Sequence, residues 1–228
     1  MKRLDRLIIP FTFLFLSCAH LPVIHPPALD TAGAVQRQCR TVYTEGAWQL
    51  LHTIEAKPPG APLQTLMGLS QISSVERTAH CVLMTIEGLV LFEANYDGDI
   101  TLQRALPPFD RPGFAEGLIE DLLLIYFIPD WPLTHTGYLE NGISVCRYQA
   151  PGEGTQDILL FKKKGWQINR YNAQNKLIRE VIPDTEAGLS PQGFPAKVTL
   201  KAPGMMGYRL NLTLVEARRL QTGHPQTK

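Results

Sequence analysis

The side chains that could act as catalysts or metal ligands are scattered along this sequence of 228 residues. The run from Gly68 to Ile72 centres on a serine but lacks the second glycine of a hydrolase nucleophile elbow. The sequence has neither an HExxH motif nor a P-loop. The histidines have no metal-ligand spacing: they are His20, His25, His52, His80, His135 and His224. We therefore expect no enzyme, with no catalytic residues, no metal site and no cofactor.

Cys18 is a residue whose surroundings indicate a defined reaction. Three cations among the first six residues precede an apolar run from Leu7 to Leu16, the layout of a secretory signal. The run is shorter than the roughly 20 residues that a membrane-spanning helix needs. Its end, Phe15-Leu16-Ser17-Cys18, resembles a lipobox, with a small residue for signal peptidase and a thiol that accepts diacylglycerol. We expect residues 1–17 to be a lipoprotein signal peptide.

The residue after Cys18 indicates where the anchored protein resides. Lipoproteins retained at the inner membrane of two-membrane bacteria typically carry Asp there, and this chain has Ala19. We expect a lipid-anchored, periplasm-facing protein of the outer membrane. An ordinary cleaved signal with a chance cysteine is the alternative.

Composition limits the partners and the covalent structure. Lys and Arg total 22 against 21 for Asp and Glu, so the sequence lacks the basic excess typical of nucleic-acid binders. Beyond Cys18, an odd number of cysteines remains, which permits at most one internal disulfide. These are Cys39, Cys81 and Cys146. Because Cys81 and Cys146 lie in apolar runs, we favour buried thiols over a bridge.

The ends of the mature chain differ from its middle. Residues 18–33 are proline-rich and predict an extended tether, which spans up to roughly 45 Å at ~3.1 Å per residue. Residues 34–220 are long enough for one domain with a sizeable core. Residues 221–228 form a polar tail that we expect to be disordered.

Apolar and polar residues alternate along most of the domain, which predicts strands. Short turns rich in Gly, Pro, Asn and Asp separate them, as in an antiparallel meander. We expect a mainly β domain with a curved antiparallel sheet of about ten strands. The strand candidates lie near 37–45, 48–56, 63–72, 77–87, 90–96, 100–106, 143–149, 156–163, 166–172, 176–182, 196–202 and 208–214.

Residues 111–128 break this alternation and predict a helix. Phe114, Leu118, Leu122 and Ile125 recur at helical spacing. We expect Asp110 to be the N-cap and Pro129 to stop the helix. An open, strongly twisted sheet would need such a helix over its apolar face, so we expect a helical lid.

Two blocks of the sequence carry a family pattern. In residues 86–98, Gly88, Tyr96, Asp97 and Gly98 match an alternating strand that ends in Tyr-Asp-Gly. In the helix, the matches are Leu118, Asp121, Leu122 and Leu124, while Phe127 and Ile128 replace an expected Trp-Pro. These blocks resemble a family of uncharacterised bacterial outer-membrane lipoproteins, whose members are found near genes for aryl-polyene-type lipids. The family is similar to the lipoprotein carrier LolA and receptor LolB, which implies a half-open barrel whose lidded apolar cavity receives acyl chains.

This resemblance gives the expected function and site. The protein would bind acyl chains of a lipid or of an acylated protein, for envelope lipid or lipoprotein transfer or insertion, with a periplasmic carrier protein as a partner. The membrane would be reached through acylated Cys18. The expected cavity residues are Leu118, Leu122 and Ile125 from the helix, and Val90, Phe92, Val198, Leu200, Leu210 and Leu212 from the sheet.

Three alternatives stay open. From the sequence pattern alone, a packed core explains the apolar faces better than a cavity does. A non-enzymatic scaffold that docks another envelope protein would have such a filled core. A hydrolase of lipid or cell wall would need a nucleophile and a base within hydrogen-bond reach, for which the sequence offers no spacing.

Overall fold

The computed structural model describes residues 20–28, 32–57, 60, 62–162, 165–204 and 207–221. Signal peptide and Cys18 lie outside these residues, so lipid attachment stays a prediction. Residues 222–228 of the predicted tail also lie outside the described residues. Among the described residues, no helix combines the length and apolar character needed to cross a membrane.

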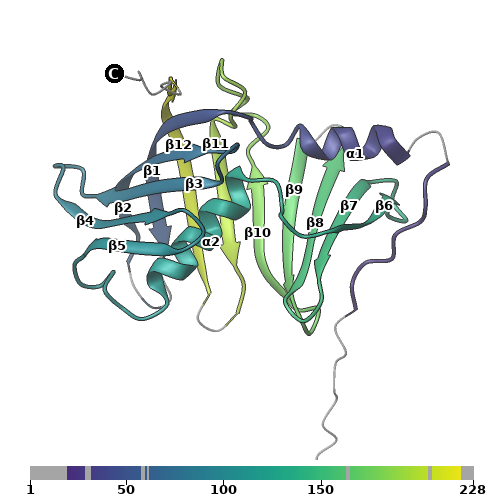
Figure 1. Ribbon diagram of the computed structural model, residues 1–228, viewed down its shortest axis with the longest axis horizontal. Helices are drawn as coiled ribbons and strands as arrows, with labels where there is room; N and C mark the ends of the chain where they lie inside the picture. Colours follow the sequence, from purple (N-terminus) through teal and green to yellow (C-terminus); the bar gives the residue numbers. More distant parts are fainter. Residues whose placement is uncertain are drawn as a thin grey trace, which may run out of the picture.

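The described strands form one antiparallel sheet that curves around a helix (Figure 1). Its order is β5-β4-β3-β2-β1-β12-β11-β10-β9-β8-β7-β6, an open sheet whose two halves are joined by the pairing of β1 with β12 and whose edges are β5 and β6. The strands are β1 (Ala47–Lys57), β2 (Gln64–Ser73), β3 (Thr78–Met84), β4 (Val90–Tyr96), β5 (Ile100–Ala105), β6 (Leu133–Tyr138), β7 (Ser144–Ala150), β8 (Gly154–Phe161), β9 (Gly165–Asn172), β10 (Leu177–Pro183), β11 (Lys197–Ala202) and β12 (Tyr208–Arg219). The predicted curved antiparallel fold is confirmed.

Irregular pairing accounts for part of the curvature. Register shifts interrupt β1 against β12 at Leu51/His52 and β3 against β4 at Leu83/Met84. A bulge bends its strand and increases the local right-handed twist. The sheet therefore wraps an apolar inner face, whose fully buried residues include Leu50, Phe92 and Ile158.

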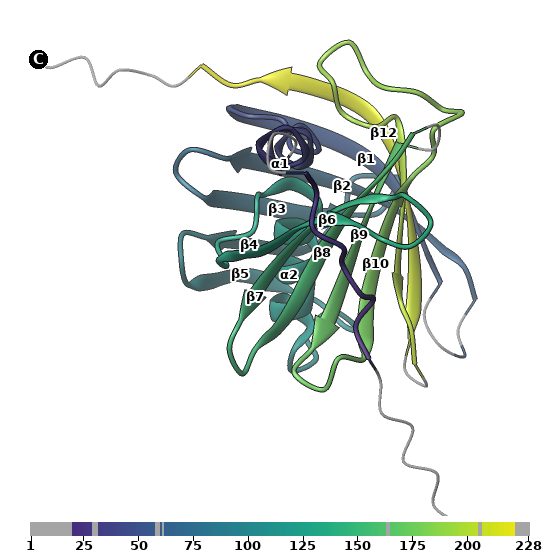
Figure 2. The same ribbon diagram turned by 90° about the vertical axis from the view of Figure 1, so that its right-hand side faces the viewer.

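Two helices cover this inner face. Helix α1 (Ala32–Arg40) packs over β6, β7 and β8, and α2 (Phe114–Tyr126) crosses the concave side of the sheet (Figures 1 and 2). The predicted strand at 37–45 is wrong. Val35 and Cys39, four residues apart, are the buried positions of α1 and follow a helical period rather than an alternating one. The helix begins two residues before the predicted domain boundary.

The predicted start of α2 also differs from the structure. The N-cap is Gly113, at φ 80°, and it has no side-chain capping bond. Asp110 is wrong as the cap because residues 107–113 form turns before the helix begins. The helix ends at Tyr126, three residues before Pro129.

A disulfide joins α1 to the sheet. Cys39 and Cys146 are bonded across 107 residues of sequence, while Cys81 is free and buried. The prediction of buried thiols is therefore wrong for Cys39 and Cys146. Cys39 lies in the segment predicted as a strand, and no local pattern of residues indicates that it lies beside β7.

Candidate functional site

The apolar stripe of α2 faces the sheet as predicted. Leu118, Leu122 and Ile125 point toward β1, β2, β3 and β12, and Phe114 packs edge-on against Phe92 with ring centroids 5.2 Å apart. Polar atoms also link this face to the sheet: the Tyr126 hydroxyl lies 3.1 Å from Nε2 of His52. Burial lowers the pKa of His52 to about 4, so the ring is neutral near pH 7.

A small apolar cavity remains beneath α2. Its volume is about 50 Å³. Since one water needs roughly 10–15 Å³ of such space, this cavity is far smaller than an acyl chain requires. Helix α2 therefore packs on a nearly filled interior on this side of the sheet. The predicted residues that line the cavity are Leu118, Leu122, Ile125, Leu210 and Leu212.

The other predicted residues lie elsewhere on the sheet. Phe92 and Leu200 are fully buried in the core, and Val198 lines a space of only about 10 Å³ near Trp166. Val90 is half-buried and belongs neither to the core cluster nor to the cavity wall. The structure therefore gathers five of the nine predicted residues around one space.

A buried carboxylate fastens α2 to the sheet. Asp121 is 4% exposed, and its Oδ1 accepts a hydrogen bond of 2.7 Å from Nε of Arg179 on β10. Its other oxygen accepts a hydrogen bond from the hydroxyl of Tyr208 on β12. Burial raises the pKa of Asp121, against the attraction of Arg179 and the bond from Tyr208. We call Asp121, Arg179 and Tyr208 the latch.

A larger hollow lies on the other side of the latch, between α2 and strands β8, β9 and β10. Its volume is about 480 Å³, within the usual range of small-molecule sites. We call it the cleft. Its apolar lining is Leu123, Leu124, Phe127, Pro129, Trp131 and Ile178, and its polar lining is Arg77, Glu120, Asp121, Asp130, Glu153, Gln156, Arg170 and Arg179.

Arg170 is the cation best placed inside the cleft. Its guanidinium carbon lies 3.4 Å from the centre of the Trp131 ring, and its Nη1 donates a 2.9 Å hydrogen bond to Gln156. Burial lowers its pKa, whereas the carboxylates of Glu120 and others nearby oppose that shift. Stacking on Trp131 holds the charged plane in position at the wall.

Sequence reasoning missed the cleft and the latch. Asp121 lies three residues after Leu118 and four before Ile125, so a carboxylate on the apolar stripe was the available signal for a buried partner. Arg170 shares its strand face with buried Ile168. The cleft itself depends on how far the sheet curves from α2, which no local pattern encodes.

The described residues hold no group of three or more His, Cys, Asp or Glu side chains arranged to bind a metal ion. The arrangement offers apolar surface beside fixed charges, which suits binding of an amphipathic molecule.

Comparisons with known proteins identify the architecture. No protein-family model and no curated protein matches the sequence. A crystal structure of a LolA superfamily protein from Nitrosomonas europaea is similar, with a TM-score of 0.56 and 8% identity, over 84% of this chain and 94% of that one. A putative outer membrane lipoprotein-sorting protein domain from Vibrio parahaemolyticus has a TM-score of 0.48 and 10% identity, over 86% and 95% of the two chains. The chain therefore has the fold of a LolA superfamily protein.

Proposed function

We propose that this protein is an outer-membrane lipoprotein, anchored through acylated Cys18, that binds acyl chains of a lipid or of an acylated protein on its concave face. It would act in envelope lipid or lipoprotein transfer, and a periplasmic carrier would supply the cargo. The fold shared with a LolA superfamily protein supports this proposal. The cleft along α2 is the observation that carries it.

The lining of the cleft suits an amphipathic ligand. Burying an acyl chain against Leu123, Phe127 and Ile178 would gain roughly 25 cal/mol for each Å² of apolar surface removed from water. A polar head would remain beside charged groups such as Arg170 and Glu153 at the wall. The acyl chain of the ligand would thus lie against apolar side chains, and its polar head would lie against charged ones.

Deeper entry requires α2 to move. The cavity under Leu118 and Leu122 holds about 50 Å³, while Asp121 lines both this cavity and the cleft. The latch therefore lies on the boundary between them. Releasing it would allow an acyl chain to pass from the cleft into the apolar space beneath the helix.

The test uses a secreted Cys18→Ser chain, which folds without its own acyl chains. Organic extracts of the purified protein are analysed by mass spectrometry, and affinity for a fluorescent fatty acid is measured. Ile178→Glu and Leu123→Glu place a charge in the cleft and are expected to weaken binding at least tenfold. Val215→Glu is the matched control, since Val215 is 57% exposed on β12.

The small volume beneath α2 favours a second candidate function, a scaffold with a filled core that docks another envelope protein. A scaffold would yield no lipid in the extracts and would not bind the fatty acid. Under that result the acyl-chain proposal is abandoned.

A further inference from the structure

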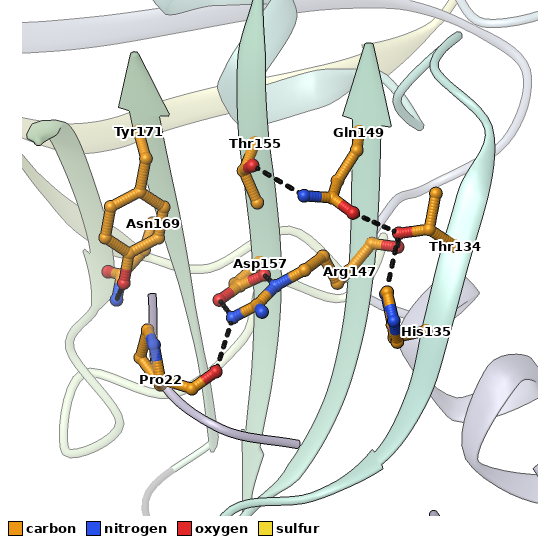
Figure 3. Close-up of polar contacts among 9 residues, drawn as sticks. All are labelled: Pro22, Thr134, His135, Arg147, Gln149, Thr155, Asp157, Asn169 and Tyr171. Atoms are coloured by element: carbon orange, nitrogen blue, oxygen red, sulfur yellow. Dashed lines mark hydrogen bonds and ion pairs between the residues drawn. The ribbon is translucent and has the colours of Figure 1, made fainter. Parts of the chain in front are cut away.

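The outer face of β7, β8 and β9 carries a buried charged pair where solvent would be expected. Arg147, Asp157 and Asn169 are register partners across these strands (Figure 3). The strand register places them on the face opposite to Cys146, Ile158 and Ile168. Asp157 is fully buried and Arg147 is 7% exposed. The guanidinium bonds both carboxylate oxygens at 2.7 Å. The convex face of an antiparallel sheet usually faces water, so something covers this pair.

The covering element is the segment 20–28, which passes in front of these strands while α2 lies behind them (Figure 2). Nη2 of Arg147 donates a 3.0 Å hydrogen bond to the carbonyl of Pro22. Farther along, His25 and Tyr138 exchange two backbone hydrogen bonds of 2.8 and 2.9 Å at edge strand β6. We call the segment 20–28 the strap. Residues 18–33 were expected to form an extended tether, but the strap within them is docked on the domain.

The sheet is shaped to receive the strap. A Cβ on Gly137 would lie 2.1 Å from the carbonyl oxygen of His25 and 2.9 Å from the side chain of Ile24. Glycine is therefore required there by the close approach of two backbones. Gly137 pairs with Val145, which is fully buried although it lies on the outer face.

The direction of the strap is fixed by these contacts. From His25, paired with Tyr138 on edge strand β6, the strap crosses β7 to Pro22, which lies beside Asp157 on β8 (Figure 3). It runs away from α1 toward the end of the strands where β7 reaches Ala150 (Figure 2). The β7–β8 and β9–β10 turns lie at that end, because Ala150 pairs with Gly154 and Gly154 with Asn172. The cleft residues near this end are Glu153, Gln156, Arg170 and Ile178.

We propose that the strap fixes the orientation of the domain on its lipid anchor, so that the end of β7–β10 beside the cleft faces the bilayer. This rests on the acylation of Cys18 within the proposed function. Pro22 is four residues after Cys18, so the Cα atom of the acylated cysteine lies within about 14 Å of docked Pro22. A free tether of residues 18–33 would permit roughly 45 Å and any orientation.

The experiment measures orientation on the mature lipidated chain in vesicles of phosphatidylethanolamine and phosphatidylglycerol. Gln174→Cys in the β9–β10 turn and Glu140→Cys in the β6–β7 turn place a fluorophore at opposite ends of the strands. Both positions are exposed, while the native disulfide and buried Cys81 leave the new thiol to react. Energy transfer to a membrane-surface acceptor is expected to be several-fold stronger from position 174.

Strap variants test the cause of that difference. His25→Pro removes the N–H that bonds Tyr138, whereas His25→Ala keeps it. His25→Pro is expected to bring the two probes toward equal transfer, and His25→Ala to preserve their order. Circular dichroism and hydrogen exchange of the Tyr138 amide report the fold and the release of the strap.

Equal transfer from the two probes in the unchanged chain, or a chain that does not attach to vesicles, overturns the proposal. So does an unchanged order in a His25→Pro chain whose Tyr138 amide exchanges freely. Fatty-acid binding by the Cys18→Ser chain is measured separately. Loss of that binding with correct probe order rejects lipid uptake alone, and retained binding with equal transfer rejects the strap alone.

Discussion

Asp121 is the side chain that ties α2 to strands β10 and β12 of the sheet. Its carboxylate is buried, whereas the Arg179 side chain is 21% exposed. Removing the arginine leaves a buried charge without a counter-ion, which costs more than removing the carboxylate. We expect Arg179→Met to lower the free energy of unfolding by about 3 kcal/mol and Asp121→Asn by about 1–2 kcal/mol.

Urea denaturation at pH 7 measures both values. Arg218→Met is the control, because Arg218 is an exposed arginine on β12. If Asp121→Asn were the more damaging change, the latch would owe its strength to the Tyr208 bond rather than to the ion pair.

His52 makes the attachment of α2 sensitive to acid. Its pKa is about 4 in the folded protein and about 6.5 when unfolded, so the unfolded state binds the extra proton between these values. Stability is therefore present above pH 6.5 and is lost as the pH falls toward 4, by about 3 kcal/mol from this group. Unfolding curves across this range check the slope. His52→Gln is expected to flatten it, and an unaltered slope would show that other groups cause the loss.

At the scale of elements, the alternation of apolar residues predicted most of the strands, and helical spacing predicted α2. The apolar stripe of α2 was placed on the correct side, since Leu118, Leu122 and Ile125 line one cavity. The segment 37–45 was misassigned because its short helix has only two buried side chains to display a period. Strand β6 was not predicted because only one of its six residues is buried, at the edge of the sheet, so its sequence shows no clear alternation. Edge elements carry weak patterns for that reason.

The disulfide compensates for the weakness of α1. A helix of nine residues is marginal by itself, and the bond ties it to β7 across a loop of 107 residues. The chain-entropy estimate for such a loop is about 4–5 kcal/mol. We expect the Cys39→Ser, Cys146→Ser double variant to lose stability of this order and α1 amides to exchange rapidly. Protected α1 amides in that variant would show that packing alone holds the helix.

At the scale of the whole molecule, the curvature of the sheet determines where space remains beside α2, and this curvature could not be predicted from the sequence. The bulges at Leu51/His52 and Leu83/Met84 arise from pairing between strands, so the sequence of a single strand does not predict them. The same curvature separates β8–β10 from α2 by the width of the cleft. Residue types predicted which faces are apolar, but only the assembled sheet shows where space remains between them.

Weakening the latch would change fatty-acid affinity in opposite directions, depending on whether α2 opens for binding or is a fixed part of the core. If α2 must open for deep binding, the measured affinity is reduced by the small fraction of open molecules. Asp121→Asn raises that fraction, so a loss of 1.4 kcal/mol in closure would tighten fatty-acid binding about tenfold while lowering the melting temperature. Calorimetry and probe titration on the same Cys18→Ser preparation give both numbers. If the affinity instead falls together with the stability, α2 does not open for binding. In that case the folded helix itself forms the binding surface, and destabilising the helix damages that surface.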